Sequence, residues 1–190
     1  MADYNGIKEQ AAQIATAGNA ELTPTQRQQL DGVVKWAGGG TLVPLERGPM
    51  EGYPHIILHR FGLNGLRARV ETYTDPTGGM NGTPLTGTSI ILDRDDGGTE
   101  KHTSYRDAGR PDHHVTEHRR NFEDPRMPGE ITQQSSARIE NGTAKPIPGA
   151  LAHEYERPSE KEINFHHTTR LADSVPAPTK PAVGMPGLSQ

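Results

Sequence analysis

Histidine is the residue type in this sequence whose clustering could support chemistry. The chain has nine histidines and no cysteine, so thiolate nucleophiles, disulfides and cysteine-ligated zinc are excluded. His114 and His118 are four residues apart, and on a helix both would lie on one face and could chelate one metal ion. One candidate function is therefore a metal-dependent hydrolase or nuclease, similar to a toxin domain. Its ligands would come from the histidines of the C-terminal part: His113, His114, His118, His153, His166 and His167.

The surroundings of these histidines argue against an enzyme. Zinc needs about four ligands held by oriented partners, whereas this segment is rich in proline and arginine. His153 and Glu154 begin a metalloprotease helix motif, but Arg157 stands where the second histidine is required. Nucleophile-elbow, Walker and dinucleotide-binding motifs are absent from the sequence. The sequence therefore predicts no enzyme, no catalytic residue, no metal ligand and no cofactor.

An acidic turn between Asp93 and Gly98 has the alternating carboxylates of a calcium loop. Counted from Asp93, the sixth position is Gly98, as in an EF-hand, but the twelfth is Ser104 where a glutamate is needed. No flanking helix is predicted. We expect a plain hairpin turn here.

The elements that must position any site begin with a run of hairpins. Residues 55 to 105 alternate apolar and polar side chains and are interrupted by glycine-containing turns, which predicts successive β-hairpins. The segment 41 to 54 contains Pro44, Pro49 and Pro54, so any strand there is an edge strand. Apolar stripes predict helices over residues 3–18 and 24–37.

The C-terminal part has a different character. Residues 107–190 contain ten prolines and only scattered apolar residues, a pattern that favours an extended or disordered arm. The predicted fold is α+β and mainly β: a helical N-terminal arm (1–40), a small antiparallel hairpin sheet (41–106) and a long, extended, irregular arm (107–190).

Composition favours a protein that obtains part of its order from neighbours. Leu, Ile, Val and Phe make up about 17% of the chain, which is low for a self-sufficient core. We therefore expect a structural interaction protein of a multi-subunit assembly, such as a capsid-decorating, head-completion or tail protein. An adaptor with one dedicated partner is a further alternative.

The predicted partners are other copies of the chain and other subunits, and the predicted location is a virion, or alternatively the cytoplasm. The absence of long apolar stretches argues against a membrane, and the net charge of −4 against a nucleic-acid partner. Aromatic residues dominate interface energetics, although for Trp36 the pattern favours anchoring its helix on the sheet over contact with another chain. The predicted interface anchors are Trp36, Phe61, Phe122 and Phe165.

Overall fold

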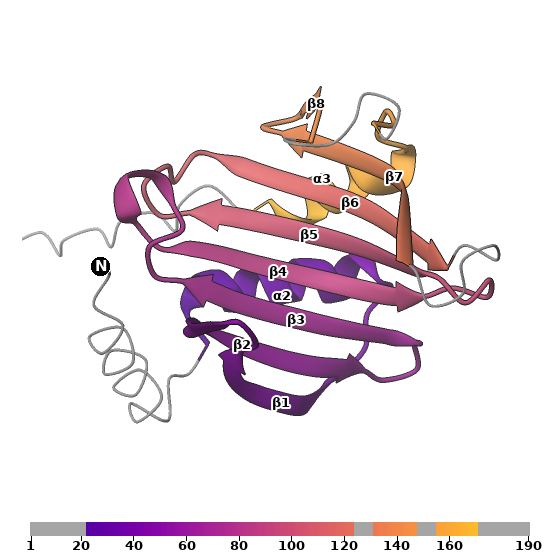
Figure 1. The fold of residues 1–190 in the computed structure, drawn as a ribbon, viewed down its shortest axis with the longest axis horizontal. Helices are drawn as coiled ribbons and strands as arrows, with labels where there is room; N and C mark the ends of the chain where they lie inside the picture. The colour runs from indigo at the N-terminus through magenta and orange to yellow at the C-terminus, as the bar shows by residue number, and fades with distance from the viewer. Residues whose placement is uncertain (1–21, 124–130, 148–154, 171–190) are drawn as a thin grey trace, which may run out of the picture.

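The fold is a single antiparallel sheet in which every strand pairs with the strands next to it in sequence. The computed structural model describes residues 22–123, 131–147 and 155–170. Within them the chain forms an eight-stranded meander in the order β1 to β8 (Figure 1). The strands are β1 (Leu42–Met50), β2 (Tyr53–Leu63), β3 (Ala68–Asp75), β4 (Leu85–Asp93), β5 (Thr99–Asp107), β6 (His114–Glu123), β7 (Ile131–Glu140) and β8 (Thr143–Lys145).

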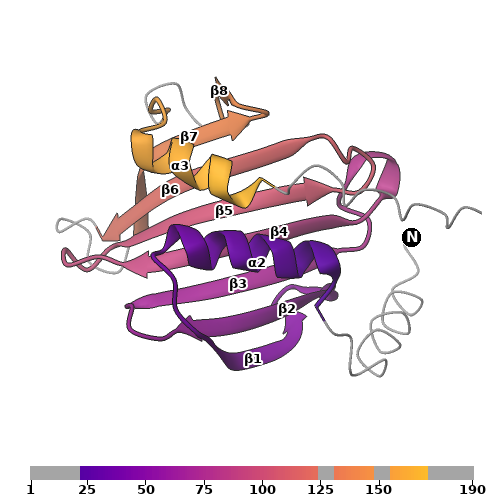
Figure 2. The same ribbon diagram turned by 180° about the vertical axis from the view of Figure 1, so that it is seen from behind.

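Two α-helices cover one face of this sheet. Helix α2 (Pro24–Trp36) lies over β3 and β4, and α3 (Glu160–Thr169) lies over β5 to β7 (Figure 2). A short 3₁₀ helix, η1 (Met80–Gly82), lies in the connection between β3 and β4. The opposite face carries no helix among the described residues (Figure 1).

Local sequence signals explain where α2 begins and ends. Thr23 and Gln26 form a reciprocal capping box, and Pro24 occupies the first turn, where its missing N–H costs nothing. After Trp36 the chain enters Gly38 and Gly39, whose φ angles of 100° and 89° favour glycine. The helix predicted over residues 24–37 is therefore confirmed, with Trp36 as its last residue.

The apolar core lies between the helices and the first half of the sheet. Leu30 and Val33 of α2 and Phe165 of α3 pack on a patch of the sheet that is equally buried, formed by Leu63, Val70 and Ile90. The two helices touch directly at Gly32, where an added Cβ would lie 2.7 Å from the Thr168 carbonyl oxygen. The core thus fixes the position of α3 over the second half of the sheet.

The second half of the sheet buries polar side chains under the helices. Alternate residues of β5 and β6 face α3 and are almost fully buried: His102, Ser104, His114, Thr116 and His118. On the α2 side, Thr88 donates a hydrogen bond to the buried Gln29 at 3.0 Å. A buried polar layer of this kind must satisfy its hydrogen bonds internally.

The mainly β, antiparallel prediction is confirmed, and so is the position of residues 42–50 at the edge of the sheet. The predicted extended arm is wrong for the described residues beyond 106, which form β6, β7, β8 and α3. Apolar periodicity is missing in β6 because its buried positions hold histidine and threonine. The helix predicted over residues 3–18 lies outside the described residues.

Candidate metal centre

The most concentrated group of ionisable side chains lies where α3 crosses β5 and β6. Glu100 and His102 are two residues apart on β5 and therefore share a face. His118 of β6 is the direct cross-strand partner of His102, and their rings stack with centroids 4.4 Å apart. Glu162 comes from α3. We call these four residues, Glu100, His102, His118 and Glu162, the Glu–His cluster.

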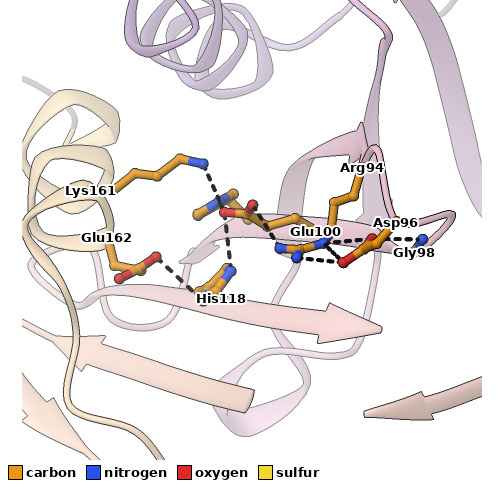
Figure 3. A network of polar contacts seen from close by, with 8 residues as sticks. Arg94, Asp96, Gly98, Glu100, His118, Lys161 and Glu162 are labelled. Atoms are coloured by element: carbon orange, nitrogen blue, oxygen red, sulfur yellow. Dashed lines mark hydrogen bonds and ion pairs between the residues drawn. The ribbon is translucent and has the colours of Figure 1, made fainter. Parts of the chain in front are cut away.

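Short polar contacts join all four members of the cluster. Oε1 of Glu100 lies 2.7 Å from Nε2 of His102 and 3.3 Å from Nε2 of His118. Nδ1 of His118 lies 3.4 Å from Oε1 of Glu162. Figure 3 shows His118 between the two carboxylates, with Glu162 reaching it from α3.

The cluster is closed off from solvent. The side chain of His102 is 0% exposed and that of His118 is 5% exposed, while each carboxylate side chain is 11% exposed. Trp36 of α2 and Phe165 of α3 pack against the His102 ring, with centroids 4.6 and 5.3 Å away. These aromatic side chains exclude water and strengthen electrostatic interactions inside the cluster.

One ammonium group lies at the solvent-facing side. Nζ of Lys161 lies 2.9 Å from Oε1 of Glu100 and 5.5 Å from the centre of the Trp36 ring. A guanidinium nitrogen of Arg94 lies 4.0 Å from the other oxygen of Glu100. Arg94 is itself held in the β4–β5 turn by Asp96 at 2.6 Å (Figure 3). Lysine and arginine thus partly balance the charge of the two carboxylates.

The pKa shifts of Glu100, His102 and Glu162 favour the protonation states of metal ligands. Close polar contacts with His102, His118 and Lys161 hold the pKa of Glu100 well below its usual range, although burial opposes this. Burial lowers the pKa of His102, against its hydrogen bond to Glu100. Burial raises the pKa of Glu162, but the Ser159 hydrogen bond and the interaction with His118 outweigh it, so the net direction is downward. Ionised carboxylates and a neutral imidazole are the forms that coordinate metals.

Glu162 is oriented by the start of α3. Its Oε2 accepts a hydrogen bond from the Ser159 backbone N–H at 2.7 Å and another from the Ser159 hydroxyl. This is the return half of a capping box, and it leaves Oε1 directed at His118. A carboxylate fixed through one oxygen while the other faces a ligand group is typical of supported metal sites.

The geometry of the cluster fits a metal ion. One ligand atom from each residue lies within 4.8 Å of the others. The ligand atoms of tetrahedral zinc are roughly 3.3 Å apart, so the four side chains would move closer together around an ion. Nε2 of His118 is buried and has no hydrogen-bond partner, despite its proximity to Glu100. A lone pair on this atom would be satisfied by a cation between the four side chains. The residues present therefore fit a four-coordinate ion with two nitrogen and two oxygen ligands.

The other predicted histidine ligands are distributed over three places. His114 and His166 form a separate stacked pair with centroids 4.3 Å apart, and His166 contacts the Thr116 hydroxyl at 2.9 Å. His113 pairs with Glu140 at 2.6 Å. His167 is exposed on α3, and His153 lies outside the described residues. Of the predicted histidines, the cluster contains His118 alone.

Sequence reasoning missed three of the four cluster members: Glu100, His102 and Glu162. The available signal was the alternation of side chains along the predicted strand, which places Glu100 and His102 on one face of β5. The helical interpretation of the His114 and His118 spacing is wrong, since both lie on strand β6. They still share a face, because a strand places residues four apart on the same side.

The remaining sequence candidates have structural explanations. The acidic segment after Asp93 is a hairpin turn, with Gly97 at a φ of 82° and Asp96 bound to Arg94 and to the Gly98 N–H. Trp36 and Phe165 pack against each other with centroids 5.0 Å apart, and Phe165 belongs to the core. Phe61 packs at the margin of this core, while the side chain of Phe122 is outside the described residues. That any of these four aromatic residues contacts another subunit stays a prediction.

Comparisons of the chain with protein-family models, curated proteins and solved structures found no significant match. Neither α-helix in the described part of the chain has the length and apolar character that a membrane span requires.

Proposed function

We propose that this protein binds one divalent transition-metal ion in the Glu–His cluster, and that the ion joins α3 to the sheet. The observation that carries the proposal is the convergence of two carboxylates and two imidazoles from β5, β6 and α3 within 4.8 Å in a closed interior. Zinc suits this donor set because it accepts nitrogen and carboxylate ligands in a tetrahedron. With four protein ligands and no open position, the ion has a structural role.

Charge balance supports the ion over the ammonium group of Lys161. Two ionised carboxylates carry a charge of −2, which one divalent cation between them neutralises fully, whereas Lys161 supplies one positive charge and Arg94 lies 4.0 Å away and is bound to Asp96. Lys161 has a side chain that is 49% exposed and can turn toward solvent when the ion binds. Its ammonium group is therefore a replaceable partner of Glu100.

The test uses the full-length chain after treatment with a chelator. Calorimetric titration with Zn²⁺ is expected to show one ion per chain, and Co²⁺ is expected to give the visible absorption of a tetrahedral site. Trp36 is the single tryptophan and contacts His102, so Co²⁺ should also quench its fluorescence. Binding should raise the midpoint of thermal unfolding, because the ion binds only the folded chain.

The ligand variant is His118→Gln, and the matched control is His113→Gln, which removes a histidine of the same strand region outside the cluster. Loss of the ligand should weaken Zn²⁺ binding by more than the roughly 10–100-fold that is lost when a residue that only orients a metal ligand is removed. The control should bind as tightly as the original chain. Absence of a saturable site, or equal affinity in both variants, would refute the proposal.

A second candidate is the predicted subunit of a multi-subunit assembly, and the edge strand β1 favours it. Among the described strands, β1 pairs with β2 on one side only, and Leu45 and Val43 are 60% and 47% exposed. An apolar open edge can pair with another strand. Light scattering should show oligomers that Leu45→Lys dissociates, and a monomer at all concentrations would contradict this candidate. Location in a virion stays a prediction.

A further inference from the structure

A cavity of about 610 Å³ opens beside α3, on the side away from the Glu–His cluster. It lies between the β7–β8 hairpin, the segment 155–158 and the outer side of α3. Its volume falls within the range of small-molecule sites. The cavity is therefore large enough for a compact organic ligand.

The cavity and the Glu–His cluster are lined by different residues of α3. Glu162 and His166 are four residues apart and face the sheet, where both are buried. Ile163 and His167 are each one residue further along, so they face outward and line the cavity. His166 also lines the cavity from its buried wall, whereas Glu162 belongs to the cluster, so the two sites share the helix but no residue.

The polar side chains that line the cavity are cationic or neutral. Arg157 and His167 are exposed there, and no carboxylate is among the described lining residues. Arg157 forms no ion pair with another described residue. A guanidinium at the wall of a concave site is the side chain best suited to bind a carboxylate through two parallel hydrogen bonds.

His166 forms the buried wall of the cavity next to Arg157 and His167. Nε2 of His166 accepts a hydrogen bond from the Gly142 N–H at 3.1 Å, which requires a neutral ring with its proton on Nδ1. Burial and the positive charges of His167, Arg106 and Arg170 lower the pKa of His166 to about 4. A ligand would therefore meet a neutral imidazole at this wall, with the guanidinium of Arg157 nearby.

The rest of the lining is apolar and would hold the body of a ligand. It consists of Ile139, Ala144, Pro146, Pro158 and Ile163, with Tyr155 beside them. Apolar walls with a few placed polar groups are typical of ligand sites. Polar groups at one part of the wall fix the orientation of a ligand whose body is apolar.

We propose that this cavity binds a small organic carboxylate with an apolar body, whose carboxylate is held by Arg157 beside His167. The site is independent of the metal centre, because none of its lining residues belongs to the Glu–His cluster. The expected ligands are monoanions of the size of a medium-chain fatty acid. Neutral or cationic molecules with the same chain should bind less well.

The experiment titrates the full-length chain with octanoate, octan-1-ol and octylammonium and follows amide shifts by NMR. The Gly142 amide is the reporter, because it lies in the lining and donates to His166. Octanoate should shift this resonance saturably, and the alcohol and the amine should bind at least about tenfold more weakly, since they lack the charge-assisted pair. Comparable affinity for all three probes, or no saturable shift with octanoate, overturns the proposal.

Two variants and one control assign the ligand to this cavity. Arg157→Gln should weaken octanoate binding by about tenfold, and Ala144→Trp should abolish it by filling the space. Arg67→Gln is the control, because it removes the same charge from a side chain that is 73% exposed in the β2–β3 turn. If either Arg157→Gln or Ala144→Trp binds octanoate as tightly as the Arg67→Gln control does, the assignment of the ligand to this cavity is refuted. The readouts do not depend on metal, so they stand whether or not the cluster binds zinc.

Discussion

Lowering the pH from about 7 to about 5 is expected to destabilise this fold through the stacked pair of His114 and His166. Both residues are almost fully buried, at 2% and 3% exposure, and their rings are nearly parallel. Burial and then the charge of Arg106 are the main causes that lower the pKa of His114 to about 2. Burial and the charge of His167 lower the pKa of His166 to about 4.

The sign follows from proton binding in the unfolded chain. There both histidines have an ordinary pKa of 6.5, so the unfolded chain takes up protons below that pH while the folded chain does not. Protonation therefore favours unfolding. At about pH 5 each histidine costs about 2 kcal/mol, and the pair about 4 kcal/mol. The loss is a large fraction of the roughly 5–15 kcal/mol that stabilises an ordinary domain.

The assay is urea unfolding monitored by the fluorescence of Trp36, with a chelator present so that metal binding does not contribute. His114 and His166 should contribute about 4 kcal/mol to the fall in the free energy of unfolding between about pH 7 and about pH 5, and the half-buried His59 and the buried His102, whose pKa values are also lowered, add to it. His166→Gln should lower stability at neutral pH but reduce this fall by about 2 kcal/mol, because one titrating group is gone.

The refuting result is a free energy of unfolding that stays constant or rises as the pH falls over this interval. The depressed pKa values of Glu100 and Glu162 act in the same direction but at lower pH, because the unfolded carboxyls have a pKa of 4.5. A fall confined to pH values below about 4.5 would therefore implicate the carboxylates and contradict the histidine assignment.

Two further predictions concern glycines at close contacts. Gly32→Ala should lower the free energy of unfolding, because the added Cβ would lie 2.7 Å from the Thr168 carbonyl oxygen and overpacking costs about 1–3 kcal/mol. This cost opposes the helix preference of alanine over glycine, which is about 1 kcal/mol. A rise in the thermal midpoint would contradict the close contact between the two helices. Gly87→Ala should destabilise the sheet by about 1–3 kcal/mol, because its Cβ would lie 2.4 Å from the Tyr73 ring. Gly48→Ala, which meets nothing within 4 Å, is the control, and equal stability of these two strand variants would argue against the packing of Tyr73 over Gly87.

Much of the first half of the fold could be predicted from local sequence patterns. The capping box at Thr23, the glycines after Trp36 and the alternation in residues 55–105 act over a few residues, so they identify α2 and the strands β2 to β5 without any knowledge of the tertiary structure. The prolines of β1 likewise indicate an edge strand.

The second half was missed because the positions of β5 and β6 that face α3 are polar. In β6 the residues that face α3 are His114, Thr116 and His118, so the hydrophobic periodicity that marks a half-buried strand is absent. Because polar residues occupy these buried positions, the sequence of residues 107–170 resembles that of an extended arm. Only the helix above them shows that these positions are interior.

The sequence by itself determined the histidine-rich, cysteine-free ligand chemistry and the hairpins within residues 55–105. Only the tertiary structure decided which side chains meet, because Glu100, His118 and Glu162 are far apart in the chain and are joined by sheet register and helix docking. Local patterns encode the face of an element on which a residue lies. The distance between faces of different elements depends on packing, and packing places α3 over His102 and His118.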